Sequence, residues 1–182
     1  MRIIAGTARG RRLHAPDTRD TRPATDRVRE AVFSSLAERV IGARVADLYA
    51  GSGSYGLEAL SRGAESAVFV EKGRKAQAAL RRNIDAVGLG GTVVAEPVER
   101  FLGRGDKQFD VLFIDPPWDL PTTVLDRQLA LLDASVVEGG TVLLSRRAGD
   151  VVPRPPETWR VATDKRYGDT RILRYEKLKA KK

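Results

Sequence analysis

One short segment groups a carboxylate, two prolines and an aromatic ring: Asp115-Pro116-Pro117-Trp118, directly after an apolar run that ends at Ile114. Proline cannot continue a central strand, so Pro116 and Pro117 mark a strand exit and a rigid loop. The exocyclic amine of a nucleic-acid base is a poor nucleophile because its lone pair is delocalised into the ring. Hydrogen bonds from that amine to the Asp115 side chain and the Pro116 carbonyl would align the lone pair and stabilise the charge that develops during attack.

Trp118 adds a flat face on which such a base could stack, an interaction worth about 1–3 kcal/mol. Taken alone, the four residues also fit a strand that ends in a Pro-Pro turn with a core tryptophan. The glycine-rich loop earlier in the chain makes that structural alternative the weaker one. We therefore predict a catalytic site at Asp115, Pro116, Pro117 and Trp118, with Pro117 shaping the turn.

The glycine-rich loop runs from Asp47 to Gly56 (DLYAGSGSYG) between an apolar run and a helical pattern. Its glycines match G-x-G-x-x-G, and Glu71 follows Gly51 by twenty positions. Such a loop lies at the carboxyl edge of a doubly wound sheet, where ligands bind. The same spacing is the dinucleotide fingerprint, so the glycines do not choose between NAD and S-adenosylmethionine.

Two carboxylates favour the methyl donor. Asp47 precedes the loop, where it could bind the amino acid end of S-adenosylmethionine directly or through water, whereas it would repel a pyrophosphate. Glu71 suits the ribose hydroxyls of either ligand. We therefore expect S-adenosylmethionine to be bound by residues of this loop, the Glu71 position and the segment after the third strand, namely Asp47, Tyr49, Ala50, Gly51, Ser52, Gly53, Glu71 and Val98.

The net charge of +8 is concentrated near the chain's ends, and residues 1–14 carry four arginines with no acid. Arginine pairs bidentately with phosphate, which favours a nucleic-acid partner for this segment. In the segment 21–30 the charges fit a capped helix with solvated side chains equally well. The arginines predicted to contact nucleic acid are Arg2, Arg9, Arg11, Arg12, Arg22, Arg27 and Arg29.

Several classes of chemistry are excluded or disfavoured by what the sequence lacks. The absence of cysteine excludes disulfides and thiolate sites, and it disfavours methylation at cytosine C5, which ordinarily needs a cysteine nucleophile. His14 is the single histidine, and no His, Asp and Glu cluster has metal-ligand spacing, so no metal is expected. No apolar stretch approaches the length of a membrane span. We expect a cytoplasmic monomer.

The elements that must position these motifs alternate between strand and helix from Arg44 onward. Apolar strands are expected at 45–49, 67–70, 92–95, 111–114 and 141–144, with helices over 57–61, 75–87 and 124–132 between them. Such a pattern predicts a mostly parallel sheet with helices on both faces, closed by an antiparallel pair at 160–163 and 172–175. Residues 2–5 and 11–14 predict a small hairpin, and a helix should begin at Thr25 or Asp26.

This α/β pattern predicts a Rossmann-like fold with a seven-stranded sheet and a small N-terminal β-hairpin extension, and together with the two motifs we interpret it as a class I methyltransferase fold. We divide the chain into a basic hairpin and arm, residues 1–25, and the methyltransferase domain, residues 26–182.

Four blocks of sequence, in order, resemble the bacterial RsmD-like family: MRIIAGTARGRRL, TRPATDRVREAVFSSL, DLYAGSGSYGLEALSRGA and DVLFIDPPW. That family methylates N2 of a guanine in 16S rRNA of the small ribosomal subunit. The resemblance implies S-adenosylmethionine as donor, 16S rRNA as partner, and an active site bordered by the arm from Arg22 to Arg29. It also implies donor contacts at Asp47, Gly51, Gly53 and Glu71, and catalysis at Asp115, Pro116 and Trp118.

The sequence departs from the family pattern at several positions. Trp118 replaces the commoner tyrosine or phenylalanine and retains stacking, Tyr49 stands for the usual phenylalanine, and Ala24 for threonine. Pro97 occupies the place where relatives often carry an aspartate beside the adenine. Glu96 or the Val98 backbone would then supply the adenine contact.

Three other functions stay open from the residues alone. A NAD-binding oxidoreductase accounts for the glycines and Glu71 but leaves the DPPW segment unexplained. A non-catalytic RNA-binding protein on a degenerate methyltransferase fold would bind RNA without turnover. Among methyltransferases, a DNA amino-methyltransferase would use the same motifs.

Overall fold

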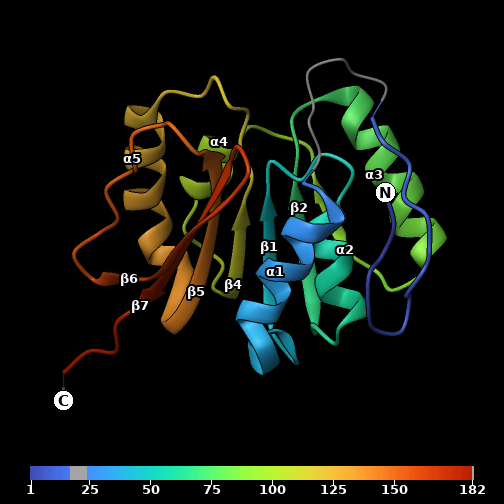
Figure 1. Cartoon of the computed structure of the whole chain (residues 1–182), viewed down its shortest axis with the longest axis horizontal. Helices are drawn as coiled ribbons and strands as arrows, with labels where there is room; N and C mark the ends of the chain where they lie inside the picture. The colour runs from blue at the N-terminus through green and yellow to red at the C-terminus, as the bar shows by residue number, and fades with distance from the viewer. Residues whose placement is uncertain (17–23, 182) are drawn as a thin grey trace.

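The computed structural model describes residues 1–16 and 24–181, which leaves Arg22 outside the described part of the chain. One sheet of seven strands organises these residues in the order β3-β2-β1-β4-β5-β7-β6 (Figure 1). Strands β1 to β5 run parallel, and β7 pairs antiparallel with both β5 and β6. The predicted fold class is confirmed. The strands are β1 (Arg44–Leu48), β2 (Ser66–Val70), β3 (Thr92–Val94), β4 (Phe109–Ile114), β5 (Val136–Arg147), β6 (Trp159–Tyr167) and β7 (Thr170–Lys177).

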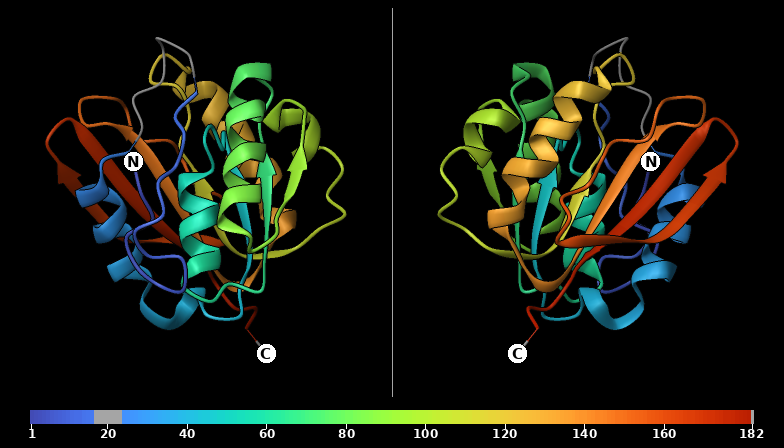
Figure 2. Two further views of the ribbon diagram at one scale, coloured as in Figure 1. Left: turned by 90° about the vertical axis from the view of Figure 1, so that its right-hand side faces the viewer. Right: turned by 90° about the vertical axis from the view of Figure 1, so that its left-hand side faces the viewer.

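Helices cover both faces of the sheet (Figure 2). Because side chains alternate across each strand, Phe113 joins the core on one face while its neighbour Leu112 joins the core on the other. The first core packs α1 (Asp26–Leu36), α2 (Ser54–Ser61) and α3 (Arg74–Val87). The second packs α4 (Val98–Leu102) and α5 (Thr122–Leu132), and two short 3-10 turns, η1 (Ala37–Val40) and η2 (Asp133–Ser135), follow α1 and α5.

The helix start predicted at Thr25 or Asp26 is confirmed, since α1 begins at Asp26 and Thr25 caps it. The Thr25 hydroxyl accepts a hydrogen bond from the Val28 amide at 3.3 Å, as an N-cap side chain does. Two other elements differ from expectation. Helix α4 was not expected because five residues are too few to show periodicity. Strand β5 begins at Val136, five residues before the predicted start at Thr141. Between Val136 and Thr141 its pairing register with β4 shifts, and Gly139 in this stretch has a positive φ of 75°.

The N-terminal hairpin is present as a single antiparallel bridge between Arg2 and Arg12, without regular strands on either side. The amides of Ile4 and Ala5 donate to the Glu58 carboxylate on α2 instead of to a partner strand, at 2.8 and 3.0 Å. Three apolar side chains of this segment enter the first core: Ile3, Ala8 and Leu13. Within the described residues no helix is long and apolar enough to cross a membrane.

Candidate active site

The glycine-rich loop joins β1 to α2 at the carboxyl edge of the sheet. Gly51 and Gly53 have φ values of 57° and 84°, the left-handed region that other residues adopt only with strain. A Cβ on Gly51 would meet no atom within 4 Å, so this backbone faces open space. A Cβ on Gly53 would lie 2.5 Å from the Leu80 side chain, and a Cβ on Gly56 would lie 2.3 Å from the Phe69 ring. Gly51 therefore leaves room for a ligand, and the other two glycines permit close packing of helix on sheet.

Asp47 is buried beneath this loop, and its carboxylate accepts a hydrogen bond from the Gly56 amide at 2.9 Å. Burial raises the pKa of Asp47 well above its usual range, the Gly56 hydrogen bond opposes that rise, and the charges of Asp115 and Glu71 add to it. Asp47 thus braces the first turn of α2 against β1. Its contact with the donor stays a prediction.

Glu71 follows the end of β2 and closes the loop from the other side. One carboxylate oxygen accepts from the Gly51 amide at 2.9 Å, and the other accepts from the Gly73 amide at 2.7 Å. Each carboxylate oxygen has a second lone pair, so Glu71 keeps the capacity to accept from ribose hydroxyls.

The remaining predicted donor residues differ in what they offer. The Tyr49 hydroxyl lies 2.9 Å from Gln128 Oε1 on α5, and burial raises the pKa of Tyr49 to about 12. The Tyr49 side chain therefore packs with the second core, and its backbone, with a φ of 60°, continues into the loop. Ala50 and Ser52 are buried, and the Ser52 carbonyl accepts from Asn83 of α3.

Of the two residues expected near an adenine, Glu96 is engaged elsewhere, because its carboxylate pairs with Arg100 and Arg104. The Val98 side chain is buried in the second core, at the start of α4 after Pro97. Only the Val98 backbone therefore remains for a donor contact at this position.

Asp115 directly follows β4, and its amide donates to the Leu48 carbonyl of β1 at 3.4 Å. The register of β1 and β4 places Asp47 beside Phe113, two residues before Asp115 on the same face. Burial raises the pKa of Asp115 to about 6, and a hydrogen bond from the Ser145 hydroxyl partly opposes that rise. The fold therefore brings the two sequence motifs to one edge of the sheet, on neighbouring strands.

The other residues of the DPPW segment differ in exposure. Pro116 is buried, Pro117 is exposed and Trp118 is half-buried. The guanidinium carbon of Arg147, from the end of β5, lies 5.1 Å from the centroid of the Trp118 ring. This is a cation–π contact, which holds one aromatic ring beside Asp115.

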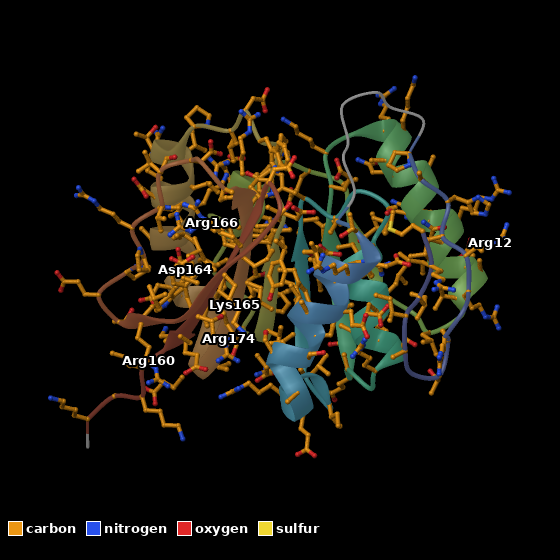
Figure 3. All side chains as sticks on the ribbon, viewed as in Figure 1. Arg12, Arg160, Asp164, Lys165, Arg166 and Arg174 are labelled. Atoms are coloured by element: carbon orange, nitrogen blue, oxygen red, sulfur yellow. The ribbon has the colours of Figure 1, made fainter. Side chains whose placement is uncertain are left out.

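Of the predicted nucleic-acid contacts, Arg2, Arg9, Arg11, Arg12 and Arg27 are exposed, and Figure 3 shows Arg12 at one end of the molecule. Arg11 donates to the Ala86 carbonyl of α3 at 2.7 Å, and Arg2 pairs with Asp26 at 3.4 Å. Arg22 lies outside the described residues.

The structure corrects the prediction that Arg29 contacts nucleic acid. Its side chain is fully buried, so phosphate cannot reach the guanidinium in this conformation. It donates to the Arg2 carbonyl and the Asp26 carboxylate, both at 2.7 Å, and lies 3.5 Å from the buried Glu58 carboxylate. Arg29 thus joins α1, α2 and the N-terminal segment. Sequence spacing alone does not reveal this role, since the partner Glu58 is 29 residues away.

Three site residues were missed in the sequence: Ser145, Arg147 and Asn83. Asn83 is fully buried, accepts from the His14 amide at 2.7 Å and donates to the Ser52 carbonyl at 2.9 Å, so it ties the N-terminal segment to the glycine loop. Ser145 and Arg147 end a strand predicted to be parallel to that of Asp115. The rule that parallel strands end at one ligand-binding edge was therefore the signal that could have found them.

No cluster of potential metal ligands occurs among residues 1–16 and 24–181.

Both the sequence and the fold of this chain match known proteins. Residues 1–176 match the family model described as conserved hypothetical protein 95. The Escherichia coli (strain K12) protein named ribosomal RNA small subunit methyltransferase D is 32% identical over 180 residues, which cover 97% of this chain and 90% of that one. The solved structure of Escherichia coli yhhF matches with a TM-score of 0.88 at 32% identity over 98% of both chains. At 12% identity, SMU.776 complexed with SAH shares the fold with a TM-score of 0.68, over 79% of this chain and 48% of that one.

Proposed function

The chain belongs to the RsmD-like family, described as conserved hypothetical protein 95, and on this premise we propose that it is an S-adenosylmethionine-dependent methyltransferase of 16S rRNA. We propose further that the acceptor is the N2 amine of a guanine. The observation that carries this proposal is the position of Asp115 and Trp118 directly after β4, the strand that pairs with β1, so that they lie at the same edge of the sheet as the glycine loop.

The residues present fit the donor. Gly51 combines a positive φ with open space where a side chain would be, so a ligand can approach its backbone closely. Gly51, Gly53 and Glu71 would hold S-adenosylmethionine, with Asp47 fixing the loop from below. When bound, the donor supplies a methyl group on a positively charged sulfur.

The protein's part in the reaction is to orient the amine and stabilise its charge. The Asp115 carboxylate accepts one hydrogen bond from the amine and the Pro116 carbonyl accepts the other, which directs the lone pair away from the base ring. As the nitrogen becomes positive, the ionised Asp115 stabilises it in a site of low dielectric. With a pKa near 6, Asp115 is mostly ionised at neutral pH.

The Trp118 ring holds the target guanine by stacking against the plane of the base. Reaching the amine requires the guanine to leave its stack, which costs a few kcal/mol and costs least in loops of structured RNA. Stacking on the Trp118 ring compensates part of that cost. Arg147 steadies the ring from the end of β5.

The test is labelled methyl transfer from S-adenosylmethionine to small ribosomal subunits, naked 16S rRNA and DNA, followed by nucleoside analysis. We expect N2-methylguanosine in 16S rRNA. Label in a DNA base would indicate a DNA amino-methyltransferase. Donor binding without transfer to any of the three substrates would overturn the proposal in favour of a non-catalytic RNA-binding protein.

A further inference from the structure

The end of the sheet farthest from the donor loop carries a cationic and an aromatic side chain, Lys165 and Tyr167, that the proposed reaction does not use. Strands β5, β7 and β6 lie side by side, and cross-strand partners point to the same face. One row of partners is Arg147, Thr170 and Tyr167, and the next row is Ser145, Ile172 and Lys165.

Both rows lie on the face that carries Asp115. Ile172 packs in the first core, beside α1, and Tyr167 packs against the same core. Ser145 donates to Asp115 on this face, and Arg147 contacts Trp118. Each row therefore begins at a residue in contact with the DPPW segment and leads across the sheet to β6.

Strands are spaced about 4.8 Å apart, so Lys165 lies about 10 Å from Ser145 across two strands. Lys165 and Arg147 are both exposed, and Tyr167 is half-buried between them and the core. Figure 3 shows Lys165 over the ribbon of β6 and β7, well away from Arg12.

Two acidic side chains on the strands of this hairpin are already in ion pairs, and the third acid, Asp169, lies in the turn between β6 and β7. Asp164 pairs with Arg171 at 2.6 Å on the opposite face, and Glu176 pairs with Arg160 at 2.6 Å. Within the described part of the chain, neither Arg147 nor Lys165 forms an ion pair. The row therefore presents two cations outside any ion pair beside an aromatic ring, which matches the phosphates and bases of a nucleic-acid strand.

We propose that Arg147, Lys165 and Tyr167 form a track that binds the single-stranded RNA flanking the target base. This inference rests on the proposed function and adds to it the path of the RNA strand. The two cations contact phosphates next to the base held at Trp118, and Tyr167 supports the strand by stacking. The phosphate backbone thus crosses β5, β7 and β6 along the face of Asp115.

A neighbouring residue provides a matched control. Arg166 is next to Lys165, is also exposed and carries the same charge, but its cross-strand partner is Arg171, so it points to the opposite face. The test compares Lys165→Gln, Arg147→Gln, the double variant and Arg166→Gln. Binding to naked 16S rRNA and to small subunits is measured between 50 and 200 mM KCl, a range in which phosphate contacts dominate the response to salt.

Each lost single-strand phosphate contact lowers the slope of log affinity against log salt by about 0.7. We expect the double variant to lose about 1.4 in slope, Lys165→Gln about half of that, and Arg166→Gln nothing. Calorimetric binding of S-adenosylmethionine should be equal in all four variants. Equal slopes for Lys165→Gln and Arg166→Gln would overturn the track.

The outcomes also separate this inference from the proposed function. If the natural protein forms N2-methylguanosine while Lys165→Gln binds RNA as Arg166→Gln does, the track fails and the reaction stands. If no methylated base forms but Lys165→Gln still flattens the salt slope, the reaction fails and the track stands. Lys165→Gln is the decisive variant, since Arg147→Gln also removes the contact with Trp118.

Discussion

Ser145 and Asp115 stand at the ends of adjacent parallel strands, and the Ser145 hydroxyl donates a hydrogen bond to the Asp115 carboxylate. Burial favours the neutral acid, whereas a hydrogen bond to the carboxylate favours the charged form. Their balance leaves the pKa of Asp115 at about 6. Ser145 thereby helps keep Asp115 ionised at neutral pH, the state that accepts hydrogen bonds from an amine.

The first prediction is a pH dependence. Because only the ionised Asp115 accepts from the amine, kcat/KM should fall as the pH drops through about 6. In Ser145→Ala the hydrogen bond that lowers the Asp115 pKa is lost, so the acidic limb should move to higher pH. Single-turnover rates between pH 5 and 8 measure this, and an unmoved limb would show that Ser145 does not control the ionisation of Asp115.

The second prediction concerns Asp115 itself. Asp115→Asn keeps the side-chain shape but removes the negative charge that stabilises the amine, so kcat should fall about 100- to 1,000-fold. S-adenosylmethionine affinity, measured by calorimetry, should change little because the loop contacts remain. Turnover close to that of the natural protein would remove Asp115 from the mechanism.

A third prediction concerns Trp118. Trp118→Ala should lose about 1–3 kcal/mol of base stacking and raise KM for RNA more than it changes donor affinity. Trp118→Phe keeps an aromatic face and should retain most of the activity. The two variants are compared by steady-state methylation of small subunits, and equal kinetics for both would argue against stacking.

The fourth prediction separates structure from RNA binding at two neighbouring arginines. Arg29→Gln removes a buried guanidinium that bonds the Arg2 carbonyl and Asp26, and it leaves Glu58 with Arg62 as its ion-pair partner, so the free energy of unfolding should fall by about 1–3 kcal/mol. Arg27 is exposed on the same helix, and Arg27→Gln should change stability by less than about 0.5 kcal/mol. Urea unfolding followed by circular dichroism compares them, and equal stabilities would contradict the structural role of Arg29.

The fifth prediction distinguishes the glycines of the loop. Gly56→Ala would place its Cβ 2.3 Å from Phe69, so overpacking should cost about 1–3 kcal/mol of stability. Gly51→Ala enters open space and bears only the strain of a positive φ, about 1–2 kcal/mol, but it fills the room left for the donor. We expect donor affinity, measured by calorimetry, to fall far more in Gly51→Ala; the opposite ranking would relocate the donor site.

The sequence by itself determined the order of the elements and the edge at which the motifs meet. Apolar runs separated by helical periodicity specify a parallel sheet, and in such a sheet every strand ends on the same side. The residues Gly51 and Asp115 could therefore be assigned to one site from local patterns. The N-cap at Thr25 was equally local, because a cap bonds within the next turn.

The tertiary structure decided which charged and polar groups meet. Arg29 reads as a surface arginine in the sequence, yet its guanidinium is buried against Glu58, and Arg147 reaches Trp118 across two strand ends. The Ile4 amide donates to Glu58, so no regular N-terminal strand forms. Periodicity records which side of an element is buried, but the partner of a buried polar group is fixed by packing between segments far apart in the chain. For that reason the motifs could be located from the sequence, whereas the contacts of Ser145 and Arg147 and the face that carries Lys165 were decided by the fold.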